Sequence, residues 1–222
     1  MEILNLGSHR IGVRFPEKGL RKGKNPAILL NDGELIEQFN LRTERAVLVG
    51  VYPNNRLSEY TPWPEPAIRP GTPDFGGQLG QYHRELNNEI RPTLIDEYAI
   101  DTEKLTYGGY SLGGLAATMS LWETDAFAAV FSLCGSFWYP GVADFIEEHV
   151  PKNYSAQVYL QNGIREGEGH NNRLCDAYSY AQRVHTALQA TCGAKTVLDD
   201  YGHHDRQSER LNAALRWVER VL

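Results

Sequence analysis

The stretch TYGGYSLGGLAAT (residues 106–118) places four of the chain's 21 glycines around one serine. Within it, Gly109-Tyr110-Ser111-Leu112-Gly113 matches the pattern GxSxG. A β-branched and aromatic segment precedes the serine, and a helix-forming segment rich in alanine follows it. This strand–turn–helix context predicts a nucleophile elbow, a tight turn in strained backbone geometry that leaves the serine hydroxyl exposed at the end of a strand.

The glycines in this stretch have a steric reason. Residues two before and two after the serine nearly touch across such a turn, so Gly109 and Gly113 are expected to clear the space. The helix N-terminus behind Ser111 favours developing negative charge. A glycine-rich turn that binds phosphate is the alternative, but the chain contains neither GxGxxG nor GxxxxGK[ST] around the serine.

Short apolar runs bounded by turn residues recur on both sides of this stretch and predict buried parallel strands. Segments with helical periodicity separate them, so the sequence predicts an α/β fold with a mostly parallel sheet. In the helical segment 82–98, Pro92 is expected to kink or divide the helix. The predicted strands are 27–32, 46–52, 105–111, 128–136, 156–163 and 196–202, with a β-hairpin over 2–15 and further helices over 112–122, 176–190 and 206–222.

The composition is typical of one soluble domain. The 222 residues are 41% hydrophobic and 23% charged, and their net charge of −6 argues against a nucleic-acid partner. No apolar run approaches the roughly 20 residues of a membrane span, and the N-terminus lacks a signal-peptide pattern. The three cysteines have no CxxC spacing, which is typical of free thiols in the cytoplasm. We therefore expect a single cytoplasmic domain over 1–222 without membrane association; the oligomeric state stays open.

Six stretches carry a family resemblance: LLNDGE (29–34), RLSEYTPW (56–63), ELNNEIRPTLIDEY (85–98), YGGYSLGGL (107–115), SLCGSFWYPG (132–141) and GHHD (202–205). In this order they resemble the "putative esterase" branch of the α/β-hydrolases, which contains enterochelin and bacillibactin esterases and some feruloyl esterases. The resemblance implies an α/β-hydrolase fold with helices on both faces of the sheet and a small or absent cap. It also implies a small ester substrate of acyl, aryl, feruloyl or siderophore type, and we expect no cofactor and no metal.

The hydroxyl of Ser111 needs a base, and in α/β-hydrolases an acid and then a histidine follow the serine along the chain. Two adjacent histidines, His203 and His204, come after the last predicted strand. The resemblance favours His204, because the family's histidine is followed by Asn or Asp, as His204 is by Asp205. Gly202 directly precedes His203 and supports the other choice. We predict His204 as the base, with His203 as the alternative.

The polar loop after the strand 156–163 supplies two carboxylates for the acid. Glu166 is predicted over Glu168 because it comes sooner after the strand, where the loop should still face the histidine. The acid would hold the imidazole tautomer and stabilise the imidazolium. The alternatives are Asp199, Asp200 and Asp205, and the resemblance also leaves room for a weak or missing acid.

An oxyanion hole needs two donors aimed at the developing charge. The amide of Leu112, directly after the serine, supplies one of them. The resemblance to the family's DG turn assigns the other to Gly33 or its neighbour Asp32. A simple turn over residues 31–33 explains this composition equally well.

The substrate pocket is expected near the C-terminal ends of the strands. Trp63 and Trp138 lie on loops there, with core packing as the alternative for each aromatic ring. Residues 53–77 hold six of the 11 prolines and are expected to form an ordered functional loop. Within this loop, Arg56 is either a substrate contact or an ion-pair partner of Glu59. The net charge favours a neutral carboxylic ester over a polyanionic siderophore.

The leading hypothesis is a serine carboxylic-ester hydrolase that works through an acyl-enzyme. A hydrolase-fold protein that binds a ligand without catalysis is one alternative. A metal-dependent hydrolase is another, although no fixed spacing such as HExxH supports it. Its possible ligands are Glu166, Glu168, His170, His203, His204 and Asp205.

Overall fold

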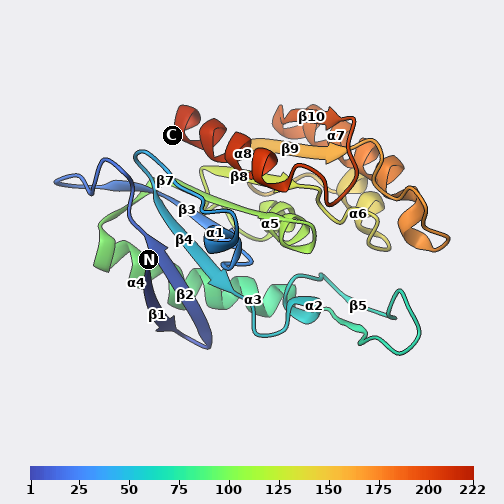
Figure 1. Cartoon of the computed structure of the whole chain (residues 1–222), viewed down its shortest axis with the longest axis horizontal. Helices are drawn as coiled ribbons and strands as arrows, with labels where there is room; N and C mark the ends of the chain where they lie inside the picture. Colours follow the sequence, from blue (N-terminus) through green and yellow to red (C-terminus); the bar gives the residue numbers. More distant parts are fainter.

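The computed structural model describes all 222 residues and is built around one eight-stranded sheet of order β1-β2-β4-β3-β7-β8-β9-β10 (Figure 1). The β1–β2 and β2–β4 pairs are antiparallel, and all other neighbours are parallel. The predicted mostly parallel sheet and the N-terminal hairpin are therefore confirmed. The strands are β1 (Glu2–Leu6), β2 (His9–Arg14), β3 (Asn25–Asn31), β4 (Val47–Tyr52), β7 (Ile100–Tyr110), β8 (Ala129–Leu133), β9 (Gln157–Gly163) and β10 (Lys195–Asp199).

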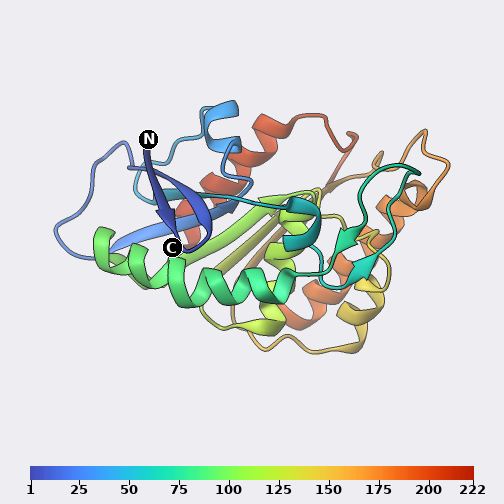
Figure 2. The ribbon, with the colours of Figure 1, turned by 90° about the horizontal axis from the view of Figure 1, so that it is seen from below.

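Helices cover both faces of the sheet (Figure 2). On one face, α1 (Leu35–Gln38) and α8 (Gln207–Val221) close a core cluster of 17 buried residues. The opposite face carries a larger core of 40 buried residues, because more helices pack there. These helices are α3 (Leu79–Glu85), α4 (Arg91–Tyr98), α5 (Leu112–Glu123), α6 (Val142–Glu148) and α7 (Ala177–Cys192). No helix combines the length and the apolar character needed to cross a membrane.

The helical stretch before β7 is divided, as its proline predicts. After α3 comes a π-helical segment, η1 (Leu86–Ile90), and α4 then begins with Pro92 in its first turn. Proline has no N–H, and its ring excludes the carbonyl four residues earlier, so the regular hydrogen-bond ladder cannot run through it. The wider π-type turn is the way in which this chain accommodates that break.

Residues 53–77 form short ordered elements between β4 and α3. They contain α2 (Arg56–Glu59) and a two-stranded antiparallel ribbon made of β5 (Pro64–Glu65) and β6 (Phe75–Gly76). Figure 2 shows this ribbon beside the main sheet, next to the loops that follow its strands. The segment is the small cap that the family resemblance implies. A second excursion, between β9 and α7, includes the 3-10 turn η2 (Arg173–Asp176).

The ion pair expected between Arg56 and Glu59 does not form. Arg56 Nε lies 2.8 Å from Asp32 Oδ1, and Glu59 Oε2 lies 3.3 Å from His9 Nε2. The two side chains leave the single turn of α2 toward different neighbours. Arg56 therefore meets the end of β3, and Glu59 meets the N-terminal hairpin.

His9 is a buried histidine that bridges two carboxylates. In addition to its contact with Glu59, its Nδ1 lies 3.0 Å from Glu85 Oε1. This bridge ties the β1–β2 hairpin to α2 and α3. Burial alone would lower the pKa of His9, but the hydrogen bonds to the two carboxylates outweigh it and raise the pKa above its ordinary value of 6.5.

The raised pKa of His9 makes the stability of the fold depend on pH. Its contribution to the free energy of unfolding is fully present below the unfolded pKa and is lost as the pH rises through the folded pKa. We expect His9→Gln to lower the free energy of urea unfolding more at about pH 6 than at about pH 9. His149→Gln, which changes an exposed histidine, is the control. Equal losses at both pH values for His9→Gln would contradict the assignment.

Candidate active site

The turn between β7 and α5 has the tight geometry that the glycine pattern predicts. Ser111 adopts φ 59° and ψ −122°, a strained conformation for a residue other than glycine. A Cβ atom at Gly109 would lie 2.4 Å from the carbonyl carbon of Gly113, so no larger residue fits there. The Ser111 amide donates to the Leu133 carbonyl at 2.9 Å, which fixes the turn to the neighbouring strand β8. The predicted tight strand-to-helix turn, with Ser111 in strained backbone geometry, is confirmed.

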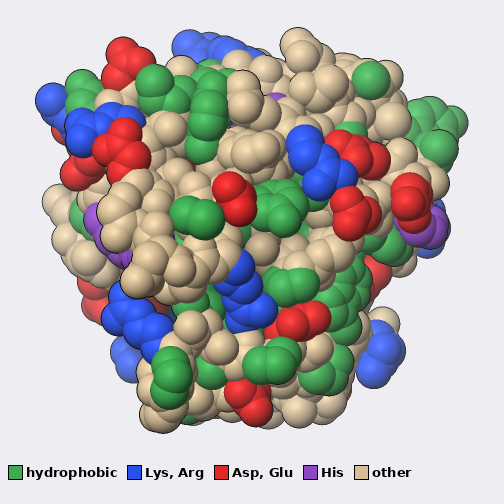
Figure 3. Space-filling model, turned by 90° about the vertical axis from the view of Figure 1, so that its right-hand side faces the viewer, with side chains coloured by type: hydrophobic (Ala, Val, Ile, Leu, Met, Phe, Trp, Pro, Cys, Tyr) green, Lys and Arg blue, Asp and Glu red, His purple; other side chains and the backbone are tan.

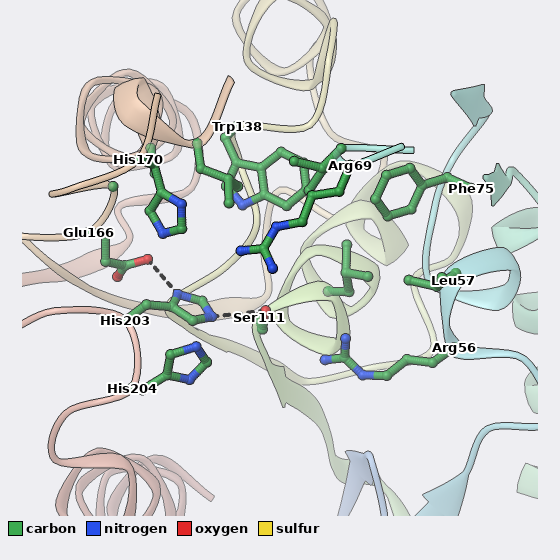
Figure 4. A pocket seen from close by; sticks show the side chains of 15 residues that line it. Arg56, Leu57, Arg69, Phe75, Ser111, Trp138, Glu166, His170, His203 and His204 are labelled. Carbon is green, nitrogen blue, oxygen red and sulfur yellow. Dashed lines mark hydrogen bonds and ion pairs between the residues drawn. The ribbon is translucent and has the colours of Figure 1, made fainter. Parts of the chain in front are cut away.

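A hydrogen-bonded chain runs from this serine through His203 to Glu166 (Figure 4). His203 Nε2 lies 3.0 Å from Ser111 Oγ, and His203 Nδ1 lies 2.9 Å from Glu166 Oε2. A carboxylate only accepts, so Nδ1 carries the hydrogen and Nε2 is left to accept from the serine hydroxyl. The imidazole is 25% exposed, whereas Glu166 is 3% exposed. The relay thus runs from a buried carboxylate to a hydroxyl at the surface of a cavity.

The histidine in this relay is His203, which corrects the expectation of His204. Tyr110 Oη donates a short hydrogen bond to the carbonyl of His203 and thereby ties this residue to the strand that ends in Ser111. The side chain of the next residue, His204, points outward and is exposed. Its ring packs edge-to-face on the ring of His203, with the two ring centroids 4.8 Å apart. Burial and the neighbouring charge of His203 lower the pKa of His204.

Glu166 is held in place by partners on the loop that follows β9. Its Oε1 accepts from the Gly163 amide at 2.7 Å and from Asn162 Nδ2 at 3.2 Å, while Oε2 faces His203. Burial alone would raise the pKa of Glu166, but the hydrogen bond and the charge of His203 outweigh it and lower the pKa. Glu166 is therefore an ionised carboxylate with a fixed orientation.

The other carboxylates considered for the acid have different partners. Glu168 is exposed and pairs with Arg165 at 2.8 Å. Asp199 accepts from the buried Arg210, with Nε to Oδ2 at 2.9 Å. Asp205 Oδ2 accepts from the Gly202 amide at 2.9 Å and shapes the turn that carries the histidines.

A buried guanidinium beneath the histidine turn is a feature that the sequence reading missed. Arg210, on α8, donates from Nη1 to Cys134 Sγ at 2.8 Å, to the Gly202 carbonyl at 3.0 Å and to Tyr110 Oη at 3.2 Å. Tyr110 in turn binds the carbonyl of His203. The side chain therefore anchors the backbone that presents His203. An arginine among the apolar positions of the last helix was the only sequence signal for this role.

The groups that could ligate a metal do not form a convincing site. Only Cys134, Glu166 and His203 bring ligand atoms within 4.8 Å of one another, so the set proposed from the sequence does not converge. Burial raises the pKa of Cys134 well above its ordinary value, which favours the protonated thiol. The Arg210 cation lies against the same sulfur, and both ring nitrogens of His203 already take part in hydrogen bonds. These contacts oppose a bound cation.

The oxyanion hole predicted from sequence is available only in part. Leu112 opens α5, where the first amides have no acceptor within the helix, and it lies next to Ser111. The Gly33 amide, in contrast, donates to the Val51 carbonyl at 3.0 Å. The Asp32 amide donates to Tyr60 Oη at 3.0 Å. Gly33 and its alternative Asp32 are therefore wrong as backbone donors, because both amides already donate hydrogen bonds within the protein.

A cavity of about 340 Å³ opens beside Ser111. Figure 3 faces the end of the molecule toward which the parallel strands point and shows basic, acidic and apolar side chains interspersed there. The apolar residues that line the cavity are Leu57, Ile68, Phe75, Leu112, Trp138, Leu174 and Ala177. The polar lining consists of Arg56, Arg69, Ser111, Glu166, Gly167, His170, His203 and His204.

The structure places two of the three expected pocket residues, Arg56 and Trp138, on the cavity wall. Trp63 is not among them, because its Nε1 donates to the Pro140 carbonyl at 2.9 Å and its ring packs against Tyr139. It braces the cap instead. Most of the missed lining residues belong to the excursions after β4 and β9, whose paths have no periodic sequence signal.

Comparison with known proteins identifies the family of this chain. Residues 7–217 match the family described as "Putative esterase". The chain is 28% identical over 204 residues to "Uncharacterized protein YbbA" of Bacillus subtilis (strain 168). The matched region covers 83% of this chain and 82% of that protein.

Solved structures show the same architecture. The BES protein from Bacillus cereus is similar with a TM-score of 0.74 and 22% identity, covering 95% of this chain and 90% of that one. Siderophore hydrolase EstA from Aspergillus nidulans is similar with a TM-score of 0.74 and 17% identity, covering 96% and 90%. These likenesses confirm the expected α/β-hydrolase fold.

The two adjacent histidines provide a matched test of the relay. Because His203, and not His204, forms a hydrogen bond with Ser111 Oγ, we expect His203→Ala to lower the rate at which a fluorophosphonate labels Ser111 by about 10²-fold or more. His204→Ala should change that rate by no more than a few-fold. Labelling rates would be followed by intact-protein mass spectrometry. A larger loss for His204→Ala than for His203→Ala would refute the placement.

Proposed function

The chain belongs to the family described as "Putative esterase" and is a carboxylic-ester hydrolase; on that premise we propose that it works through an acyl-enzyme formed on Ser111. His203 is the general base, and Glu166 orients it. The observation that carries this proposal is the continuous relay Glu166–His203–Ser111, which ends at a strained elbow beside a cavity.

The reaction has two halves that use the same histidine. In the first, His203 Nε2 takes the proton of Ser111 as Oγ attacks the ester carbonyl, and then gives it to the departing alcohol oxygen as the C–O bond breaks. In the second, His203 takes a proton from water, whose oxygen attacks the acyl carbonyl. The proton returns to Ser111 Oγ as the acid leaves.

The part played by Glu166 follows from its position. Its ionised carboxylate accepts the Nδ1 hydrogen of His203 and so keeps Nε2 free to receive a proton. When His203 becomes an imidazolium, the same carboxylate lies 2.9 Å from the new positive charge. A buried pair at this separation is screened less than one in water, which lowers the barrier for proton transfer.

The cavity supports a small ester with an apolar or aryl group. Phe75 and Trp138 contact each other edge-to-face with ring centroids 6.2 Å apart and offer an apolar wall of suitable size for one ring or a short acyl chain.

The polar side of the cavity favours a second substrate type. Arg69 lines it without a hydrogen bond from its guanidinium to the rest of the chain, and His170 and His204 line the same cavity. These groups favour an ester that carries phenolic or carboxylate oxygens, such as a siderophore-type ester. The net charge of −6 disfavours a polyanionic substrate. The basic groups in the cavity outweigh it, because local charge governs the potential in a cleft.

The nucleophile can be tested directly. We expect Ser111→Ala to lower kcat for a p-nitrophenyl ester by about 10⁴-fold or more, because the acyl-enzyme cannot form. The variant should also lose fluorophosphonate labelling while keeping its circular-dichroism spectrum. A wild-type chain that neither labels nor turns over an ester would favour the ligand-binding alternative. Undiminished turnover by Ser111→Ala would end the proposal.

The acid has its own matched pair. Glu166→Gln removes the charge that faces His203, and we expect kcat to fall by about 10²–10⁴-fold with a smaller change in KM. Glu168→Gln removes an exposed carboxylate of the same loop and should leave kcat within a few-fold of wild type. Steady-state kinetics on one ester would compare the two. Equal kcat values for both variants would refute the role of Glu166.

A further inference from the structure

The relay of the proposed mechanism depends on how the buried carboxylate of Glu166 is oriented. Its Oε2 faces His203, while its Oε1 accepts from the Gly163 amide at 2.7 Å and from Asn162 Nδ2 at 3.2 Å. The backbone amide is fixed by strand β9, to which it belongs. The side-chain amide of Asn162 has a donor end and an acceptor end, so a neighbouring group must fix its direction.

The surroundings of Asn162 determine which end faces which neighbour. The ionised Glu166 and the Gly135 carbonyl only accept, so the atom that faces both is the amide nitrogen, at 3.2 Å and 3.4 Å. The amide oxygen lies 3.0 Å from Nε2 of His185, on α7. Because an amide oxygen only accepts, His185 carries its hydrogen on Nε2 and donates it to Asn162.

On the premise of the proposed acyl-enzyme mechanism, we propose that His185 is a positioning residue that acts on Glu166 through Asn162. Its N–H fixes the direction of the Asn162 amide, and that amide holds Glu166 Oε1 so that Oε2 stays toward His203. The hydrogen-bonded chain that ends at Ser111 thus begins two side chains deeper, on the helix α7.

Packing does not explain a histidine at this position. His185 is 4% exposed, and its other ring nitrogen, Nδ1, is buried without a hydrogen-bond partner. A buried acceptor without a partner costs free energy, and an apolar ring such as that of Phe would avoid this cost. The contact that Phe could not make is the hydrogen bond from Nε2 to Asn162. This bond is therefore what histidine contributes here.

The ring of His185 is neutral and keeps one tautomer. Burial lowers the pKa of His185 to about 4, while the charge of Glu166 acts in the opposite direction. A neutral ring has one hydrogen, and the oxygen of Asn162 places it on Nε2. Because His185, Asn162 and Glu166 are all buried, water does not compete for these hydrogen bonds, and the orientation exists before substrate binds.

The helix α7 gives His185 a fixed position. The residues Ala181, Val184 and Leu188 of the same helix are fully buried, so the backbone that carries the ring is anchored in the core. The ring of Phe137 contacts the imidazole edge-to-face, with centroids 6.5 Å apart. The donor is therefore held by an element that does not belong to the mobile-looking loops of the cavity but to the core of the fold.

Substitutions at one position separate the hydrogen bond from the ring. We expect His185→Phe, which keeps a ring but removes the donor, to lower kcat for a p-nitrophenyl ester by about tenfold with little change in KM. His185→Gln brings an amide N–H near the position of Nε2 and should keep kcat within a few-fold of wild type. Val184→Ala, which removes buried methyl groups from the same helix, should lower the urea midpoint but leave kcat within a few-fold.

A double-mutant cycle tests whether His185 acts through Asn162. Asn162→Ala alone is expected to lower kcat by about tenfold or more, because Oε1 of Glu166 then keeps only its backbone donor. Adding His185→Phe to this variant should cause no further loss, since the histidine has no amide left to orient. Independent effects would instead multiply to about a hundredfold, and that result would overturn the role of His185.

His185→Leu is a second truncation, with the same expected loss, if His185→Phe does not fold. A kcat close to wild type in the truncated variant, or a kcat of His185→Gln as low as that of the truncated variant, would also overturn it. Fluorophosphonate labelling of wild-type Ser111 and the kcat of Glu166→Gln separate the two levels. If either fails its expectation, the proposed mechanism fails; if both meet it and the truncated variant keeps its kcat, only the role of His185 fails.

Discussion

The close approach of Gly109 and Gly113 across the β7–α5 turn is the constraint on which the site depends. With no side chain between them, the strand enters the helix directly, and Ser111 is forced into positive φ with its hydroxyl outside the turn. The same approach brings the first turn of α5 against Asp32 at the end of β3. One backbone contact therefore places Ser111, a helix N-terminus and the Asp32–Arg56 ion pair within one small region.

His203 reaches that region from the opposite face of the sheet. It precedes α8, and the buried Arg210 of that helix joins Asp199, Gly202 and Tyr110 into one network. The guanidinium of Arg210 is 1% exposed, so removing its partner Asp199 would leave a buried charge unpaired and would cost stability. The contacts that hold the backbone of His203 thus also hold α8 against the sheet, so the stability of the fold and the geometry of the relay are coupled.

The sequence was sufficient where local chemistry determines structure. Apolar runs and glycine sterics predicted the parallel sheet and the tight turn at Ser111. The position of the polar loop after β9 predicted that Glu166 would face the histidine. The choice of His204 was wrong because a tertiary contact, from Tyr110 to the carbonyl of His203, decides which of two adjacent side chains faces inward. The prediction of Gly33 as an oxyanion donor was wrong for a similar reason, since only the fold shows that its amide donates to the Val51 carbonyl. The cap between β4 and α3 has no periodicity, so its wall residues could not be placed.

The site contains two paired carboxylates that behave differently during the reaction. Asp32 faces a permanent cation, so that pair is the same in the ground state and in the transition state. In the mechanism we propose, Glu166 faces an imidazole that becomes charged when it takes the proton of Ser111. The Asp32–Arg56 pair therefore keeps the same attraction throughout, and the Glu166–His203 pair gains attraction on the way to the transition state. Because only interactions that strengthen on that path accelerate a reaction, the proposed mechanism assigns the direct lowering of the barrier to Glu166, while the first pair fixes the position of a side chain on the cavity wall.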